Sequence, residues 1–312
     1  MHTPLAPGTE FDLIQRIWRS LGDRQAATGD DCTFITVGTE QLAVTSDIMI
    51  EGTHFRRGWI SMEEIGWRAT TASLSDVAAV AGEPIGVMVS VGVNEEWPAD
   101  WTTELMDGVG GAAAAVGAKV LGGDLVRSDV FVVDVFALAR ATAPVTWSGA
   151  SVGDGIYVTG TLGGPMAALV GWVGGEEPDA DARERFARPA ARVEEAAWLK
   201  AVGASAMIDV SDGVLADAAH IACASNIACE IDADRVPVHA AATPDQALTG
   251  GEEFELLVTL RGVDEEDVTE RFRDRFGLEL TRIGECSAGD GVRLVKGGQP
   301  ISIPEGFKHF RS

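Results

Sequence analysis

Aspartate residues recur along this chain in five short clusters, each of which joins an aspartate to a second aspartate, a hydroxyl residue or a glycine. The clusters are Gly29-Asp30-Asp31, Thr45-Ser46-Asp47, Ser75-Asp76, Gly122-Gly123-Asp124 and Asp209-Val210-Ser211-Asp212. Carboxylates that converge repel one another, and burying them without partners costs several kcal/mol each. A fold that gathers these clusters must therefore neutralise them, and bound cations do this most directly.

The side-chain ligand atoms in these clusters are all oxygens, which magnesium prefers. Magnesium in sites of this kind commonly also holds substrate phosphates. Any one of these aspartates, taken alone, is more often a helix cap or a turn residue than a metal ligand. Five such clusters in one chain favour a shared metal site and, with it, phosphate chemistry.

Length and composition indicate a two-domain α/β protein. The 312 residues suffice for about two domains with separate cores, and 46% of them are hydrophobic. The most apolar stretch, residues 77–93, contains Glu83 and Pro84 and falls short of a membrane span. Residues 1–10 lack a basic region followed by an apolar run, so we expect no secretory signal and a cytoplasmic protein.

Charge and cysteine content argue against further classes. The formal net charge of −24 and the lack of a Lys/Arg cluster disfavour nucleic-acid binding, whereas a small anionic substrate can bind through metal ions. The four cysteines form no C-x-x-C pair, so we expect reduced packing residues and no zinc site. The chain has no G-x-x-x-x-G-K-[ST] loop and no complete G-x-G-x-x-G. Without a cysteine and histidine that could pair, covalent acyl chemistry is also unsupported.

The first half of the chain predicts alternating helices and strands. Helices are predicted over 11–21, from the N-cap Ser61 with Glu64 in its capping box to about residue 80, and over 98–116. Strands are predicted over 32–37, 42–45, 84–93 and 130–139. We expect Asp47 just past the second strand, Asp76 in the last turns of the second helix, and the aspartates mostly in connections.

The second half begins after an unpatterned segment, residues 142–153, and the expected domains are 1–147 and 148–312. Strands are predicted over 156–159, 206–209 and 254–260, helices over 194–202, 212–224 and 265–276, and a hairpin-like region over 284–303. Asp209, Ser211 and Asp212 then share a strand-to-helix turn. The glycine loop 160–164 before Pro165 could cradle an anion, although such turns are routine.

Two further motifs contain candidate ligand contacts. Glu51-Gly52-Thr53-His54-Phe55 follows Asp47 closely, but a single histidine is more often structural than functional. Gly250-Gly251-Glu252-Glu253-Phe254 could be an ordinary turn into a strand, or it could present carboxylates to a cationic ring. Phosphoryl transfer requires metal ligands and positioned charges more than a side-chain nucleophile, and the aspartates match that requirement.

Seven motifs, in order and spacing, resemble those of the thiamine-monophosphate kinase family over nearly the whole chain. They lie at residues 29–32, 45–47 with 51–55, 74–79, 122–124, 156–160, 208–213 and 250–256. The wider superfamily includes aminoimidazole ribonucleotide synthetase, formylglycinamidine ribonucleotide synthase, selenophosphate synthetase and a hydrogenase maturation factor. The E-G-x-H-F and G-G-E-[DE]-[YF]-E-L signatures favour the thiamine member.

The resemblance implies a two-domain aminoimidazole ribonucleotide synthetase-like α/β fold. Its N-terminal sheet would pair with that of a second copy into a β-barrel, giving a homodimer, and its C-terminal α/β domain would cover the active site. The implied enzyme is a phosphotransferase that uses ATP and several Mg²⁺ ions. It would move the γ-phosphate in line to thiamine monophosphate, giving thiamine diphosphate and ADP.

The resemblance also implies roles for individual residues. The metal ligands would be Asp31, Thr45, Ser46, Asp47, Asp76, Asp124, Asp209 and Asp212, with Asp30 just behind them. Asp47, Asp76, Asp124 and Asp212 would form the catalytic set. Gly123, Asp124 and Ser211 would contact ATP, while His54, Glu252 and Phe307 would contact thiamine monophosphate.

Some positions depart from the family pattern. Trp147 stands where an arginine is common before Ser-Gly-Ala, so a nucleotide-phosphate contact is missing or comes from Arg127 or Arg140. Residues 236–249 form a segment that is short for the family. Two alternatives stay open: an amidine-forming or selenophosphate-forming enzyme of the superfamily, and a non-catalytic nucleotide or metal sensor. The lack of a cysteine ahead of Gly29 disfavours selenophosphate synthesis.

Overall fold

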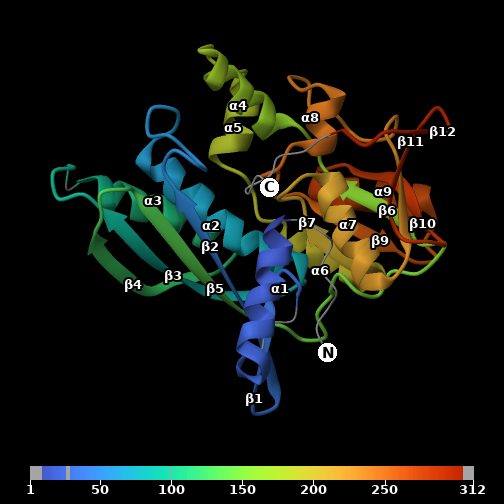
Figure 1. Cartoon of the computed structure of the whole chain (residues 1–312), viewed down its shortest axis with the longest axis horizontal. Coiled ribbons are helices and arrows are strands. Elements are labelled where there is room, and N and C mark those ends of the chain that lie inside the picture. The colour runs from blue at the N-terminus through green and yellow to red at the C-terminus, as the bar shows by residue number, and fades with distance from the viewer. Residues whose placement is uncertain (1–8, 26–28, 99, 305–312) are drawn as a thin grey trace.

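The structure, a computed structural model, describes residues 9–25, 29–98 and 100–304. The first part contains α1 (Thr9–Leu21), the 3-10 helix η1 (Gly22–Arg24), β1 (Thr33–Val37), β2 (Glu40–Ile50), α2 (Met62–Ala79), β3 (Glu83–Val93), α3 (Asp100–Ala115), β4 (Lys119–Arg127) and β5 (Val132–Arg140). The second contains β6 (Gly155–Thr159), α4 (Gly164–Gly174), α5 (Ala180–Ala187), α6 (Val193–Val202), β7 (Ala204–Asp209), α7 (Val214–Ser225), β8 (Ala228–Asp232), α8 (Pro244–Thr249), β9 (Leu256–Leu260), α9 (Glu265–Phe276), β10 (Leu280–Ser287), β11 (Gly291–Lys296) and β12 (Gln299–Ile301). Figure 1 shows these two parts side by side, with α4 and α5 above their junction.

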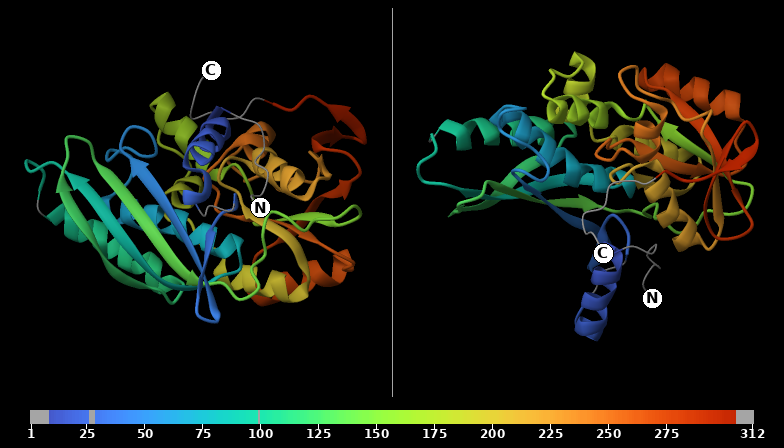
Figure 2. Two further views of the ribbon diagram at one scale, coloured as in Figure 1. Left: turned by 60° about the horizontal axis from the view of Figure 1, so that its bottom comes forward. Right: turned by 45° about the horizontal axis from the view of Figure 1, so that its top comes forward.

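The N-terminal sheet has the order β1-β2-β5-β3-β4 within the described residues, and helices α2 and α3 cover one of its faces (Figure 2). Because successive side chains of a strand point to opposite faces, Val87, Val89 and Val91 of β3 are buried under the helices. Met88, on the other face, is 45% exposed, as is Ile48 of β2 at 52%. One face of this sheet is therefore a core face, and the other is an open surface with apolar side chains.

The C-terminal sheet has the order β12-β11-β8-β10-β6-β9-β7 in the part of the chain that is described, and helices cover both of its faces. Ile156 and Val158 of β6 pack in the same cluster as Leu215 of α7. Tyr157, between them, packs on the other side in a cluster that includes Leu199 of α6. Strands buried on both faces read as continuous apolar runs, which explains the sequences of β6 and β9. None of the described helices has the length and apolarity needed to cross a bilayer.

Helix α2 joins the two domains and begins as the sequence predicts. The Ser61 side chain accepts a hydrogen bond from the backbone N–H of Glu64, and Glu64 Oε2 accepts from the backbone N–H of Ser61 at 2.8 Å. Its close contact with α3 depends on two glycines. A Cβ atom at Gly66 would lie 2.0 Å from the carbonyl oxygen of Leu105, and one at Gly108 would lie 1.8 Å from that of Glu63. The two helices therefore touch backbone to backbone.

The structure confirms most of the predicted elements and corrects the place of two aspartates. Strand β2 continues to Ile50 because its ladder with β5 is unbroken as far as Val132, so the prediction that Asp47 lies past the strand is wrong. Asp124 likewise lies inside β4, paired with Ser90. The region 284–303 is a hairpin only from β11 to β12, since β10 pairs with β6 and β8. The short elements α5, β8 and α8 were not predicted.

The glycine contact between α2 and α3 generates a stability prediction. Gly108→Ala should lower the free energy of unfolding by about 2 kcal/mol, because the added methyl group forces two backbones apart. Gly110→Ala is the matched control on the same helix: a Cβ there meets nothing within 4 Å, so a gain of about 0.5 kcal/mol is expected from the higher helix propensity of alanine. Urea denaturation followed by circular dichroism measures both. Equal stabilities of the two variants would contradict the packing argument.

Candidate active site

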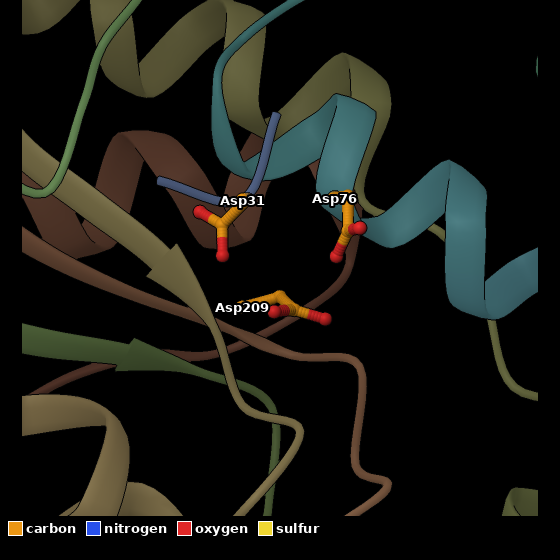
Figure 3. Close-up of side chains that lie close together, drawn as sticks. All are labelled: Asp31, Asp76 and Asp209. Carbon is orange, nitrogen blue, oxygen red and sulfur yellow. The ribbon is translucent and has the colours of Figure 1, made fainter. Parts of the chain in front are cut away.

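Three aspartates from distant parts of the chain meet between the two domains. Asp31 lies just before β1, Asp76 lies in the last turns of α2, and Asp209 ends β7. One carboxylate oxygen of each lies within 4.8 Å of the others, and Figure 3 shows the three side chains around a common space. This cluster could hold a metal ion, and both domains contribute to it.

Burial and mutual repulsion dominate the electrostatics of the cluster. Loss of hydration raises the pKa of Asp76 well above its usual range, and the charges of Asp47 and Asp209 add to this effect. The pKa of Asp31 rises well above its usual range for the same reasons. Burial raises the pKa of Asp209 to about 7 and that of Asp30 to about 7. Without a cation, the folded chain therefore holds these carboxylates at a free-energy cost.

Hydroxyl groups orient the carboxylates of the cluster. Thr45 Oγ1 donates a hydrogen bond to Asp76 Oδ2, and Ser75 Oγ donates to Asp209 Oδ2 at 2.6 Å. Asp47 lies on the same face of β2 as Thr45, and burial raises its pKa. Its Oδ2 atom is buried and has no hydrogen-bond partner among the described residues. An oxygen in that state fits a cation ligand, because a buried polar atom without a partner is otherwise costly.

Ser46, predicted as a ligand with Thr45 and Asp47, presents its side chain elsewhere. Alternation along β2 places it on the open face of the sheet, where Ser46 Oγ donates to Asp134 Oδ1 at 2.7 Å. The side chain of Ser46 is therefore not brought to the cluster. Consecutive residues of a strand cannot both point to the same face. The motif Thr45-Ser46-Asp47 does not by itself show that these residues lie in a strand.

The turn from β7 into α7 is held by a carboxylate that the sequence analysis missed. Asp217 Oδ2 accepts hydrogen bonds from the backbone N–H groups of Ser211, at 3.2 Å, and Asp212, at 3.3 Å. Burial and the charge of Asp212 raise the pKa of Asp217 well above its usual range. The signal in the sequence was a single acidic residue in an otherwise apolar helix.

A pocket of about 100 Å³ adjoins this turn and brings together four residues that were predicted as ligand contacts. They are His54, Ser211, Asp212 and Glu252, and the pocket is completed by Thr53, Gly251, Pro165, Met166 and Leu169. The last three begin α4, which reads as an ordinary apolar helix, so its role as a pocket wall was not predicted. Trp59 and Trp172 stack with their centroids 5.2 Å apart, which connects the segment after His54 to the same helix.

Glu252 is fixed in the pocket wall by an ion pair and by its backbone. Its Oε2 lies 2.7 Å from Nη2 of Arg68, whose side chain is fully buried and packs 3.7 Å from the centroid of the Phe186 ring. The backbone N–H of Glu252 donates to the carbonyl oxygen of Ser211 at 2.7 Å. Its φ of 63° is left-handed, a conformation that non-glycine residues adopt where the surroundings enforce it, often at functional sites. The carboxylate is therefore placed with little freedom.

The next two glutamates of this motif are structural. Burial raises the pKa of Glu253 to about 8, and its Oε1 accepts the backbone N–H of Gly163. The backbone N–H of Gly163 in the glycine loop 160–164 is thus taken by a carboxyl group of the same chain. Burial acts to raise the pKa of Glu255, yet Arg192 and Arg185 hold it below its usual range. These contacts tie the Glu252 motif to α4, α5 and α6.

The structure does not bring the remaining predicted residues to the cluster. Gly123 contacts β3, where a Cβ atom would lie 1.8 Å from the carbonyl oxygen of Val89. Asp124 is exposed on β4, three strand spacings of about 4.8 Å from β2. Arg127 pairs with Glu95, and Arg140 pairs with Glu40 and Glu83. Phe307 lies outside the described residues.

One serine motif has to be set apart from the acidic site. Residues 149–153 read Gly-Ala-Ser-Val-Gly and fit the G-x-S-x-G pattern. A nucleophile elbow requires a sharp turn from a strand into a helix, but these residues lie in an irregular segment that leads into β6. Ser151 Oγ accepts a hydrogen bond from Arg261 at 2.7 Å. The motif is part of a surface turn, so it gives no support to acyl chemistry.

Comparisons with known proteins match both halves of the chain. The family described as AIR synthase related protein, N-terminal domain, matches residues 29–141, and the corresponding C-terminal domain family matches residues 151–297. The thiamine-monophosphate kinase of Mycobacterium tuberculosis is 36% identical over 81% of this chain and 81% of its own length. That of Aquifex aeolicus is 30% identical over 96% of this chain and 98% of its own length.

Solved structures of thiamine-monophosphate kinases also match this chain. AaThiL complexed with AMPPCP and TMP has a TM-score of 0.84 at 30% identity and covers 96% of this chain and 97% of its own. Thiamine-monophosphate kinase from Stenotrophomonas maltophilia has a TM-score of 0.78 at 32% identity, covering 94% of this chain and 98% of its own. Hydrogenase maturation protein HypE in complex with ATP, at 18% identity and a TM-score of 0.73, shares the fold. The two-domain α/β fold with two mixed sheets is thereby confirmed.

The raised pKa of Asp209 predicts the pH dependence of the metal-free protein. This carboxyl group titrates near its ordinary value in the unfolded chain and at about 7 in the folded chain, so its contribution to stability falls as pH rises between those values. Asp209→Asn removes that loss. In the presence of a chelator, the variant should gain at least about 1 kcal/mol over the wild type between pH 5 and pH 8.

Urea denaturation at the two pH values measures this gain. Asp274→Asn, at an exposed aspartate of α9 that is not part of the cluster, is the control for the removal of one carboxylate. Identical pH dependence of the stability of Asp209→Asn and of the wild type would show that the pKa of Asp209 is not raised in the folded chain.

Proposed function

This chain belongs to the thiamine-monophosphate kinases of the AIR synthase-related superfamily, and on that basis we propose that it transfers the γ-phosphate of ATP to thiamine monophosphate. The observation that carries the proposal is the pocket beside the carboxylates. Ser211 and Asp212 line the pocket and lie two and three residues after Asp209, so an acceptor phosphate bound there would lie next to the aspartate cluster. The products are thiamine diphosphate and ADP.

The carboxylates fit Mg²⁺ as the cation of this site. Their donors are all oxygens, they repel one another, and Asp47 Oδ2 is buried without a partner in the described chain. We assign the binding of Mg²⁺ to Asp31, Asp47, Asp76, Asp209 and Asp212, with Thr45 as a further oxygen donor. Mg²⁺ held by these residues would offset the repulsion between the two phosphates and would stabilise the charge of the transition state.

The residues of this chain supply placement more than proton transfer. A phosphate monoester with a second pKa of about 6 is largely dianionic at neutral pH, so its oxygen attacks without a general base. The Glu252 carboxylate, held by Arg68, faces the pocket and complements a cationic ring. His54 is oriented by the backbone N–H of Ile50, which donates to its Nδ1 at 3.1 Å.

Apolar side chains complete the proposed thiamine pocket. Pro165, Met166 and Leu169 supply a wall against which the flat faces of a heteroaromatic ring can pack. Phe307, which the family resemblance assigns to ring stacking, would add an aromatic contact to this wall. An apolar wall opposite the Glu252 carboxylate suits a cationic aromatic substrate better than a sugar phosphate.

We propose that the ATP site, to which Gly123, Asp124 and Ser211 are assigned by motif, is completed by a second copy of the chain. In one chain Asp124 lies on β4, three strands from β2, and is not one of the three carboxylates that meet at the cluster. The open face of the N-terminal sheet exposes Ile48, Met88 and, at 59%, Val126. Pairing of two such faces into a barrel would bury these side chains. A monomer in analytical ultracentrifugation would remove Asp124 from the catalytic set.

The first test is a coupled assay with purified protein, ATP, Mg²⁺ and thiamine monophosphate. Thiamine diphosphate should form, and Asp76→Asn or Asp47→Asn should lower kcat at least about 100-fold, since each removes a cation ligand that acts on the transition state. The circular dichroism spectra of both variants should match that of the wild type. Turnover of other phosphate acceptors without any thiamine diphosphate would reject the function, and retained activity in both variants would reject the site.

The apolar wall gives a second prediction. Met166→Ala should raise the KM for thiamine monophosphate about tenfold and leave kcat and the KM for ATP unchanged, because ring packing is shared by ground and transition states. Val170→Ala is the control on the same helix, at a side chain that is 53% exposed and does not line the pocket. Steady-state kinetics with each substrate varied in turn measures the difference. A similar effect of both variants would place the ring elsewhere.

A further inference from the structure

Trp147 links the segment between the two sheets to the carboxylate cluster. Its indole Nε1 donates a hydrogen bond to Asp31 Oδ2 at 2.8 Å, and its backbone N–H donates to Asp30 Oδ2 at 3.1 Å. The side chain is buried, with 7% of its surface exposed. The indole therefore acts on one of the three aspartates that meet at the candidate metal site.

The C-terminal domain holds this indole in place. The carbonyl oxygen of Trp147 accepts a hydrogen bond from Ser225 Oγ at 3.0 Å, and its ring lies 4.7 Å from that of His220. Ser225 Oγ also accepts the backbone N–H groups of Gly149, at 3.2 Å, and Ala150, at 3.1 Å. His220 and Ser225 both belong to α7. Trp147 is thus anchored on one domain and directs its N–H to a carboxylate of the other.

We propose that Trp147 is a positioning residue that fixes the Asp31 carboxylate for a divalent cation. Asp31 is surrounded by Asp76 and Asp209, whose charges push it away, so a donor is required to keep it facing them. The indole N–H supplies that donor without a charge of its own.

This role differs from a contact with nucleotide phosphate, because an indole has one donor and that donor is used by Asp31. The inference rests on the proposed function only in the identity of the cation, Mg²⁺. Residues that orient a metal ligand commonly contribute between about 10-fold and 100-fold to metal affinity. We therefore expect Trp147 to act mainly on cation affinity, and to affect phosphoryl transfer only through the bound cation.

The test measures Mn²⁺ binding, by following the electron paramagnetic resonance signal of free Mn²⁺ during titration of the full-length protein. Mn²⁺ takes the same oxygen ligands as Mg²⁺. Trp147→Phe keeps an aromatic ring and removes the N–H, and it should raise the dissociation constant for Mn²⁺ about tenfold. Trp198→Phe, a matched change on α6 where the ring packs on Phe272, should leave that constant unchanged.

A double variant separates positioning from packing. If Trp147 acts through Asp31, Trp147→Phe should change Mn²⁺ affinity less than twofold in an Asp31→Asn background. The proposal is overturned if Trp147→Phe weakens Mn²⁺ binding equally in both backgrounds, or if it does not weaken Mn²⁺ binding in the wild-type background. Benzothienylalanine at position 147, in which sulfur replaces the indole N–H at nearly constant ring size, should reproduce the loss seen in Trp147→Phe. It also serves as the test variant if phenylalanine impairs folding, and normal affinity would then reject the proposal.

The outcome is independent of the kinase assay. Weaker Mn²⁺ binding in Trp147→Phe with no thiamine diphosphate formed by the wild type would retain the positioning role and reject the proposed function. Active wild-type enzyme with unchanged Mn²⁺ binding in Trp147→Phe would retain the proposed function and reject the positioning role.

Discussion

The repulsion among buried carboxylates at the domain junction is the constraint on which the rest of this structure depends. Asp31, Asp76 and Asp209 come from a loop, a helix and a strand, and loss of hydration raises the pKa of each. A chain does not gather such groups by accident, because packing in the surrounding domains must offset the cost. Such packing is visible in α2, the helix that contains Asp76, whose glycine contact with α3 places two backbones against each other.

The pocket proposed for thiamine monophosphate lies at the same junction. The turn after Asp209 forms one wall, and the backbone hydrogen bonds of residues 252–254 to Val210 and Ser211 fasten the second wall to it. The carboxylates near the pocket have different hydrogen-bond and ion-pair partners from those in the cluster. Glu252 and Glu255 have arginine partners, whereas the cluster aspartates have hydroxyl and indole donors. Paired carboxylates serve structure and placement, and the carboxylates without cationic partners are those available to a metal.

The sequence predicted the elements that carry local signals. The capping box at Ser61, the apolar run of β6 and the charged helix over 265–276 depend on residues close in the chain, and all three are present. Asp47 was misplaced because the length of β2 is set by its pairing with β5, which no local pattern reports. Asp217, Arg68 and the α4 wall were missed because their roles depend on contacts across long stretches of chain. The opposite directions of Ser46 and Thr45 follow from strand alternation, once β2 is known to continue through them.

The hydrogen bond from Ser75 to Asp209 joins residues 134 positions apart in the chain. Such a contact closes a long loop, whereas the helices and strands on either side depend mainly on contacts within their own domains. Each domain can therefore build its own core before the carboxylates approach one another. A cation that binds carboxylates from both domains would stabilise the docked arrangement of the two domains by mass action.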